Sequence, residues 1–160
     1  MEQERESFLK PSPVERIFNR VFGFFVSAGI GLRHNYVLEV RGRKSGRLYS
    51  TPVDLLEVTG RRYLVCPRGR AQWVRNAEAI GRVTLKRGSR RTEYVLRAVT
   101  AAERPGLLKA YLDRFKTVVQ RYFPVPAGSP ADAFEPYLDR YPVFELTESR
   151  THGETDAGAT

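Results

Sequence analysis

The stretch Val40-Arg41-Gly42-Arg43-Lys44-Ser45-Gly46, followed by Tyr49-Ser50-Thr51-Pro52, decides how this chain is interpreted. A turn bracketed by two glycines lies between two runs whose side chains alternate as they do in strands. Glycine permits positive φ and close approach of backbone N–H groups, while the arginine and lysine between the glycines supply charge and the serine supplies a hydroxyl. The turn is therefore a candidate site for a phosphate or a carboxylate.

A Walker A loop is excluded at this turn by its spacing. Leu38 and Arg43 stand where that motif needs its two glycines before Lys44 and Ser45. The residues that follow alternate with period two, whereas the motif requires a helix there. The sequence thus predicts a hairpin with an anion-binding turn.

Working outward from this hairpin, period-two patterns and turn residues predict six strands and an antiparallel barrel. A short helix is expected over 72–79, ending at Gly81, and a longer one after the capping box Thr100-Ala101-Ala102-Glu103. The longer helix is followed by a connection over 124–136. The apolar stripe of that helix is expected to consist of Leu107, Leu108, Tyr111, Leu112, Phe115, Val118, Val119 and Tyr122. Strands joined mainly by turns, with helices at the start, middle and near the end, predict a mainly β fold with peripheral helices, an α+β chain and not a doubly wound sheet. The expected strands are 36–41, 48–58, 62–66, 83–87, 92–99 and 141–147.

The ends of the chain are interpreted differently from its centre. We expect a flexible segment over 1–12, one barrel domain over 13–147 and a disordered tail over 148–160. A helix is predicted to begin at the capping box Ser12-Pro13-Val14-Glu15, and its residues 14–26 form an aromatic apolar face. That face either covers the core or contacts a membrane surface or lipid.

Composition narrows the class of function. The formal charge of +9 comes from 27 Lys plus Arg against 18 Asp plus Glu, which implies an anionic partner: nucleic acid, an acidic membrane surface or a polyanionic small molecule. One cysteine and two histidines make a disulfide framework, a metal site and a histidine-based triad improbable. Cys66 ends an apolar strand and is interpreted as a packing residue, because nothing nearby pairs it with a base. An acidic N-terminus and no apolar run of about 20 residues favour a cytoplasmic protein, soluble or peripherally membrane-associated.

Three segments together carry a resemblance to a known family. Gly42-Arg43-Lys44-Ser45-Gly46 with Thr51-Pro52, then Pro67-Arg68-Gly69, then Gln72-Trp73-Val74-Arg75-Asn76, are similar in order and spacing to the deazaflavin (F420)-dependent nitroreductases, of actinobacterial type. The resemblance covers about 35–99, with a weaker fit at 141–147. It implies a split β-barrel that binds the polyanionic coenzyme F420, with FMN as the alternative cofactor. The cofactor-binding residues it implies are Arg43, Lys44, Ser45, Arg47, Thr51, Pro52, Pro67, Arg68, Gly69, Trp73 and Asn76.

The group that protonates a substrate is not identified by the sequence. Tyr111, Tyr122 and Tyr137 are candidates because each has a phenolic proton, although the first two lie on an apolar helix stripe and packing is their default interpretation. No metal ligands are expected. The loop after the third strand and the pair Gln72-Trp73 depart from the commoner family pattern, which leaves the substrate open.

The expected function is an F420-dependent oxidoreductase that transfers a hydride to an activated alkene, a quinone or a nitro compound. Such chemistry belongs to the cofactor, so a chain poor in histidine and cysteine can perform it. The alternatives are an FMN-dependent oxidoreductase and a non-catalytic lipid, fatty-acid or F420-binding protein of the same fold. Nucleic-acid binding is unlikely, because the basic residues gather on turns and no RNP-like motif is present. The oligomeric state is left open.

Overall fold

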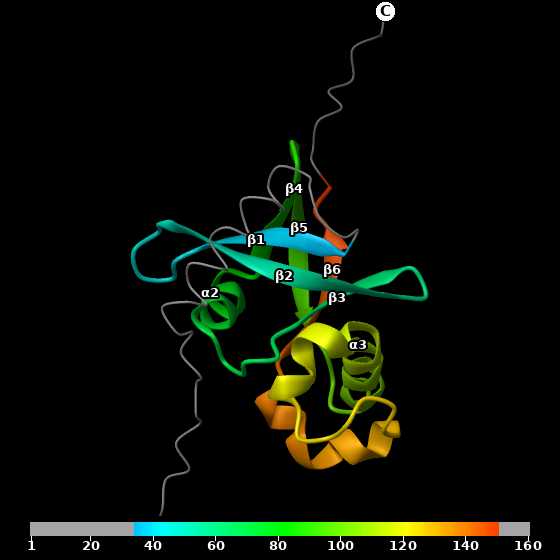
Figure 1. Ribbon diagram of the computed structural model, residues 1–160. Coiled ribbons are helices and arrows are strands. Elements are labelled where there is room, and N and C mark those ends of the chain that lie inside the picture. Colours follow the sequence, from blue (N-terminus) through cyan, green and yellow to red (C-terminus); the bar gives the residue numbers. More distant parts are fainter. Residues whose placement is uncertain (1–33, 151–160) are drawn as a thin grey trace, which may run out of the picture.

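The computed structural model describes residues 34–150, and in this range the chain forms a closed antiparallel barrel (Figure 1). The strand order is β1-β2-β3-β6-β5-β4, with β4 returning to β1. This confirms the predicted six-stranded antiparallel barrel. The strands are β1 Asn35–Arg41, β2 Leu48–Val58, β3 Arg61–Val65, β4 Arg82–Arg87, β5 Arg90–Ala98 and β6 Val143–Glu148.

The helices lie against two separate parts of the barrel. α2 (Gln72–Ile80) sits beside the turn between β1 and β2, whereas α3 (Arg104–Val119) and the 3-10 helices η1 (Gln120–Tyr122) and η2 (Ala131–Arg140) gather below the barrel in Figure 1. α2 ends at Gly81, as predicted, because this glycine takes the left-handed conformation (φ 75°). The segment 124–136, predicted to be a connection, is in part the helix η2.

Of the three hydrophobic clusters in the described residues, the two larger ones hold the barrel and the lower helices together. Alternate residues of a strand face opposite sides, so Leu55 and Leu64 pack inside the barrel, where Ala77 of α2 also reaches. Their neighbours Leu56 and Tyr63 face outward and pack under α3, η1 and η2. The middle of α2 and the second half of β2 are therefore fixed by buried contacts, whereas the start of β2 and Ile80 at the end of α2 are exposed.

The apolar stripe of α3 differs from the prediction at one residue. Phe115 leaves the helical conformation (φ −110°, ψ 18°), and this kink rotates the residues that follow it. Val118, expected on the buried stripe, is 61% exposed, whereas Val119 is buried. An unbroken 3.6-residue period therefore placed Val118 wrongly.

Some predictions fall at or beyond the limits of the described residues. The helix expected from residue 13 and its aromatic face over 14–26 lie outside them. At the other end, β6 continues to Glu148, and the N–H of Ser149 still donates to the carbonyl of Glu93 (2.9 Å), so strand pairing extends past the predicted boundary at 147. Within 34–150, no helix is long and apolar enough to cross a bilayer, and no three His, Cys, Asp or Glu side chains are grouped to hold a metal ion.

Candidate functional site

The turn between β1 and β2 is closed by its own backbone. The N–H of Gly42 donates to the carbonyl of Arg47 (2.7 Å), and the N–H of Gly46 donates back to the carbonyl of Gly42 (2.9 Å). Gly46 has φ 69°, which strains any residue with a side chain. At Gly42 the requirement is space, because a Cβ there would lie 2.7 Å from Ser45 Oγ and 2.8 Å from Tyr49 Cε2.

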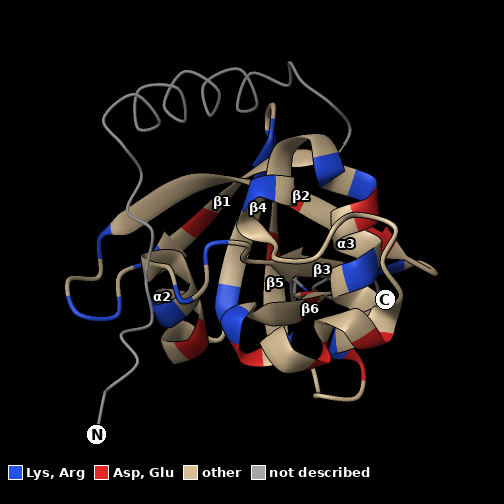
Figure 2. Cartoon of the chain, turned by 60° about the horizontal axis from the view of Figure 1, so that its bottom comes forward, with Lys and Arg blue, Asp and Glu red and all other residues tan. Residues whose placement is uncertain are grey.

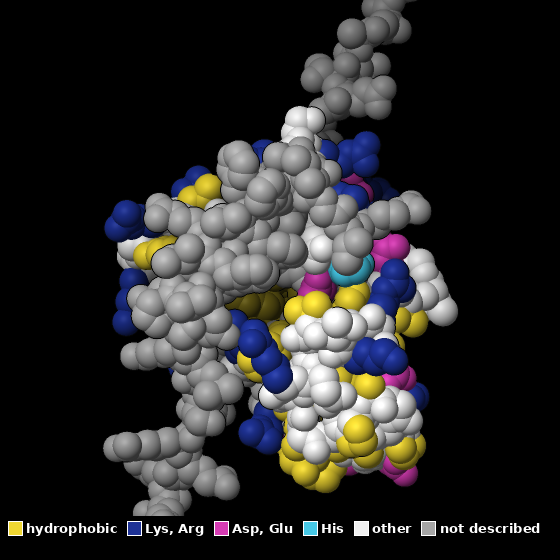
Figure 3. Space-filling model, in the orientation of Figure 1, with side chains coloured by type: hydrophobic (Ala, Val, Ile, Leu, Met, Phe, Trp, Pro, Cys, Tyr) yellow, Lys and Arg dark blue, Asp and Glu magenta, His cyan; other side chains and the backbone are white. Residues whose placement is uncertain are grey.

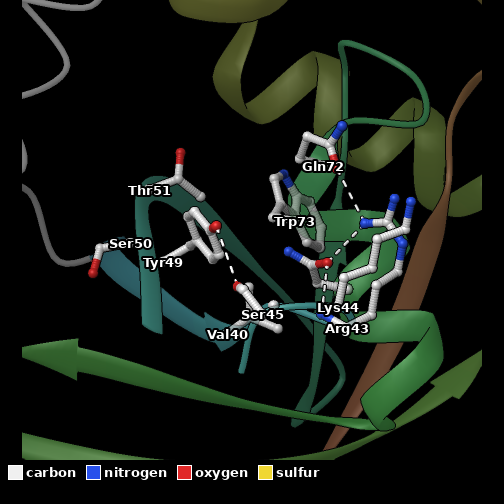
Figure 4. A pocket seen from close by; sticks show the side chains of 11 residues that line it. Val40, Arg43, Lys44, Ser45, Tyr49, Ser50, Thr51, Gln72 and Trp73 are labelled. Carbon is white, nitrogen blue, oxygen red and sulfur yellow. Dashed lines mark hydrogen bonds between the residues drawn. The ribbon is translucent and has the colours of Figure 1, made fainter. Parts of the chain in front are cut away.

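Helix α2 holds this turn through Arg43 (Figure 4). The backbone N–H of Arg43 donates to Asn76 Oδ1 (3.2 Å), and its guanidinium donates to the same oxygen (2.8 Å) and to Gln72 Oε1 (3.1 Å). Gln72 and Asn76 are one helical turn apart and share a face of α2. Asn76 is only 5% exposed, so its amide fixes the turn to a buried part of the helix.

A cavity of about 500 Å³ opens between the turn, the adjoining strands and α2. This volume is within the range of small-molecule binding sites. Figure 4 shows the side chains around it, which come from β1, the turn that follows it, β2 and the first two turns of α2. The lining residues are Val40, Gly42, Arg43, Lys44, Ser45, Tyr49, Ser50, Thr51, Gln72, Trp73 and Asn76.

The cavity has a positive charge that no carboxylate among its lining residues offsets. In Figure 2 the turn carries Lys and Arg and no acidic residue, and Figure 3 shows basic side chains along the same edge of the molecule. Several arginines elsewhere are paired with carboxylates, among them Arg82 with Glu93 (3.0 Å) and Arg70 with Glu78 (2.5 Å). Lys44 forms no hydrogen bond or ion pair with any residue in 34–150, so its ammonium is available to an anion.

The structure brings together six of the residues that the resemblance implied. They line the cavity side by side: Arg43, Lys44, Ser45, Thr51, Trp73 and Asn76. Five other lining residues were not on the predicted list: Val40, Gly42, Tyr49, Ser50 and Gln72. Periodicity contained the signal for two of them, because Tyr49 lies two residues before Thr51 on a strand and Gln72 lies four before Asn76 on a helix.

The other implied residues lie apart from the cavity lining. Arg47 is exposed in the turn, and its N–H donates to Ser45 Oγ (3.2 Å), while Pro52 pairs with Val37 inside the sheet. The loop that contains Pro67 turns toward the lower helices. There the Arg68 guanidinium donates to the Tyr122 hydroxyl (3.0 Å), and a Cβ at Gly69 would lie 3.4 Å from the carbonyl of Arg140.

The three candidate proton donors belong to the helical side of the molecule. Tyr111 is 2% exposed, and this burial raises the pKa of its phenol well above the ordinary value. The hydroxyl of Tyr122 accepts hydrogen bonds from Arg68 and from Arg121 (2.7 Å), and Arg140 lies over the ring of Tyr137 (5.8 Å). None of the three lines the cavity, whereas Tyr49 does.

Cys66 is a packing residue at the end of β3. Its side chain is 2% exposed and packs with Val74 and Phe144, as its place in an apolar run predicted. Burial raises the pKa of the thiol to about 11, so it stays protonated and unreactive near neutral pH.

The closed barrel with a cationic turn beside α2 is the split β-barrel architecture that the resemblance implied. A family described as F420H(2)-dependent quinone reductase matches residues 18–122. Since this match spans well over half of the 160 residues, the chain belongs to that family and is an oxidoreductase. The predicted relationship to the deazaflavin-dependent reductases is thereby confirmed.

Solved structures resemble this chain at low sequence identity. An F420-H2 dependent reductase, FDR-A, is 19% identical over 72% of this chain and 95% of its own, with a TM-score of 0.49. The heme storage protein HutZ from Vibrio cholerae is 11% identical over 89% of this chain and 93% of its own, with a TM-score of 0.54. A structure described as a domain-swapped dimer is 17% identical over 85% of this chain and 100% of its own, with a TM-score of 0.52. The last two similarities show a shared fold. Among proteins with curated descriptions, none matches the sequence.

Proposed function

We propose that this protein transfers a hydride from reduced F420 to a small acceptor, which is a quinone, an activated alkene or a nitro compound. Membership of an F420H2-dependent family supports the cofactor. The observation that carries the proposal is the Lys44 ammonium, which pairs with no residue in 34–150 and lies in a cavity whose lining has no carboxylate, because such a site attracts a polyanionic ligand.

The residues of the cavity fit this cofactor. F420 joins a planar ring system to a phosphate and an acidic tail, so it needs cationic donors beside a slot for the ring. Lys44 offers an ammonium and Ser45 a hydroxyl, while Arg43 is held in place by Gln72 and Asn76. These three residues would hold the phosphate and the tail, and Thr51 and Trp73 would lie along the ring.

The chemistry of the reaction is supplied by the reduced deazaflavin when it is bound, as a hydride donor. The protein then has to bind and orient the ring and exclude water from it. Trp73 contributes to that exclusion, because it presents an apolar surface to the cavity while packing against Phe144 (6.2 Å between ring centroids). The acceptor must take up a proton as well as the hydride, and because the lining has no carboxylate or imidazole, that proton would come from water.

A titration of purified protein with F420 tests the cofactor site. The Lys44→Ala variant should bind F420 about tenfold or more weakly, because a hydrogen bond to a charged partner contributes roughly 1.5–3 kcal/mol. Lys116→Ala removes the same charge from an exposed position on α3 and should bind as the wild type does. Equal affinity of the two variants, or no saturable binding by the wild type, would contradict the proposed site.

FMN is the alternative ligand, since it also carries a phosphate on a planar tricyclic ring. Competition between the two distinguishes them: F420 bound at the site should be displaced only by a large excess of FMN. If FMN displaces F420 at equal concentration or binds more tightly, the cofactor assignment is wrong even though the anion site is right.

A further inference from the structure

Tyr49 is a large aromatic residue that the cores of the described chain do not use. It is 48% exposed and belongs to none of the hydrophobic clusters formed within 34–150. Its ring nevertheless has a defined place, because Cε2 lies where a Cβ on residue 42 would have to go. The glycine at 42 has no positive φ, so a side chain there would meet the ring of Tyr49 and the hydroxyl of Ser45, which would have to shift.

The hydroxyl of Tyr49 lies beside the anion-binding end of the cavity. It is 3.5 Å from Ser45 Oγ, at the limit of a hydrogen bond. Ser45 Oγ already accepts the N–H of Arg47, which leaves the serine proton for another acceptor. A tyrosine hydroxyl can donate one hydrogen bond as well as accept others. Two hydroxyl donors and the Lys44 ammonium thus share one short turn and the strand that follows it.

Trp73 faces the same cavity from helix α2. Figure 4 shows Tyr49 entering from the strand and Trp73 entering from the helix. Trp73 is partly buried against the barrel core and against Phe144, so its ring is also held in place. The cavity therefore has an aromatic residue from each of its two walls and the hydroxyl and ammonium donors at the turn.

We propose that Tyr49 is a ligand-binding residue that selects phosphate-bearing planar ligands: its ring forms the wall of the cavity that faces Trp73, and its hydroxyl donates to the ligand's phosphate beside Lys44. This inference rests on the proposed F420 site and adds a specificity-determining residue to it. An exposed tyrosine seated against a glycine, with no role in the cores, is explained by a ligand that contacts both its ring and its hydroxyl.

Trp73 makes a direct assay available, because it is the single tryptophan of the chain and it lines the cavity. Its emission can be followed while two ligands are added: F420, and the riboside of the same deazaflavin, which lacks the phosphate and tail. Tyr49→Phe removes the hydroxyl and keeps the ring. Gly42→Ala adds a Cβ at 2.8 Å from Tyr49 Cε2 and should displace the ring by local contact alone. Tyr36→Phe, on β1 outside the cavity lining, is the matched control.

Tyr49→Phe should bind F420 about tenfold more weakly and the riboside with unchanged affinity, because only the phosphate contact is lost. Gly42→Ala should weaken the binding of both ligands. The double variant Gly42→Ala, Tyr49→Phe should lose less F420 affinity than the two single variants lose together, since both changes act on the same side chain. Tyr36→Phe should match the wild type, with unchanged circular dichroism for all variants.

Two negative results have different meanings. Suppose that the wild type binds F420, and that Tyr49→Phe either binds both ligands as tightly as the wild type or loses affinity for both by the same factor. The role of the hydroxyl is then refuted, and the F420 site stands. If neither ligand changes the Trp73 emission of the wild type, the proposed function fails and the inference about Tyr49 fails with it.

Discussion

Asn76 is the side chain on which the geometry of the cationic turn depends most. One buried amide oxygen accepts both the backbone N–H and the guanidinium of Arg43, and so joins α2 to a turn 33 residues earlier in the chain. Because Lys44 and Ser45 follow Arg43 directly, their direction is fixed by the same bonds. The amide is neutral, so it holds Arg43 without cancelling its charge, as a carboxylate would.

Replacing this amide should cost stability as well as binding. Asn76→Ala removes the buried acceptor of two hydrogen bonds from Arg43, one of them from its charged guanidinium, and together these bonds contribute about 1–3 kcal/mol. Urea denaturation should show a loss in this range. Gln72→Ala removes only an exposed acceptor of the same arginine and should lose much less. Comparable losses in the two variants would mean that the buried amide has no special role.

Cys66 makes the free energy of unfolding depend on pH in the alkaline range. Its pKa is raised from the ordinary 9.0 to about 11 by burial, so the folded state holds the thiol proton more tightly than the unfolded chain. The stability it contributes is complete below pH 9 and is lost as the pH rises to 11, by at most about 2–3 kcal/mol. Unfolding free energies of wild type and Cys66→Ala measured over this window should converge toward pH 11; parallel curves would disprove the assignment. Tyr111 is present in both proteins, so its contribution cancels when their unfolding free energies are compared.

At the scale of the elements, the sequence predicted the strands and helix ends that are determined by residues close to one another in the chain. Period-two alternation identified all six strands, and Gly81 marked the end of α2, because both follow from backbone geometry and local side chains. Val118 and η2 were missed for the opposite reason. The kink at Phe115 and the 3-10 helix are set by how α3, η1 and η2 pack on one another, which no single segment encodes.

The capping box of α3 is an element that the sequence predicted and that can be tested alone. The N–H of Thr100 donates to Glu103 Oε2 (3.0 Å), and the N–H of Glu103 donates to Thr100 Oγ1 (3.3 Å). Thr100→Ala should therefore lower the unfolding free energy by about 1 kcal/mol, with a lower Tm. Thr117→Ala, exposed later on the same helix, is the control and should not destabilise the protein. A Tm unchanged in Thr100→Ala would show that packing alone holds the helix start.

At the scale of the whole molecule, the site arises where the charge pairing stops. The excess of basic residues is balanced over much of the barrel by partners such as Glu93 for Arg82, and Arg97 bonds to both Glu103 and Glu145. At the β1–β2 turn no lining carboxylate does this. A field of one sign at a cavity attracts anions and raises their local concentration, which suits a polyanionic cofactor.

The candidate site was predictable in part for the same reason. Arg43, Lys44 and Ser45 lie together because they are adjacent in sequence, and Trp73 and Asn76 join them as the resemblance implied. The loop with Arg68 was expected at the same site, but its guanidinium bonds to Tyr122 on the helical side. Tyr49 shares a strand face with Thr51, which periodicity could indicate, but its contact with Gly42 could be found only from the closed turn.

Hydride transfer itself is the measurement that tests the central claim most directly. Reduced F420 is mixed anaerobically with the protein and, in turn, with a quinone, an activated alkene and a nitroaromatic, and its oxidation is followed by absorbance. The account predicts that at least one acceptor oxidises the cofactor well above the protein-free rate, and that Lys44→Ala slows this at low cofactor concentration while Lys116→Ala does not. If the protein is saturated with reduced F420 and none of the three acceptors oxidises it faster than the protein-free rate, hydride transfer is contradicted.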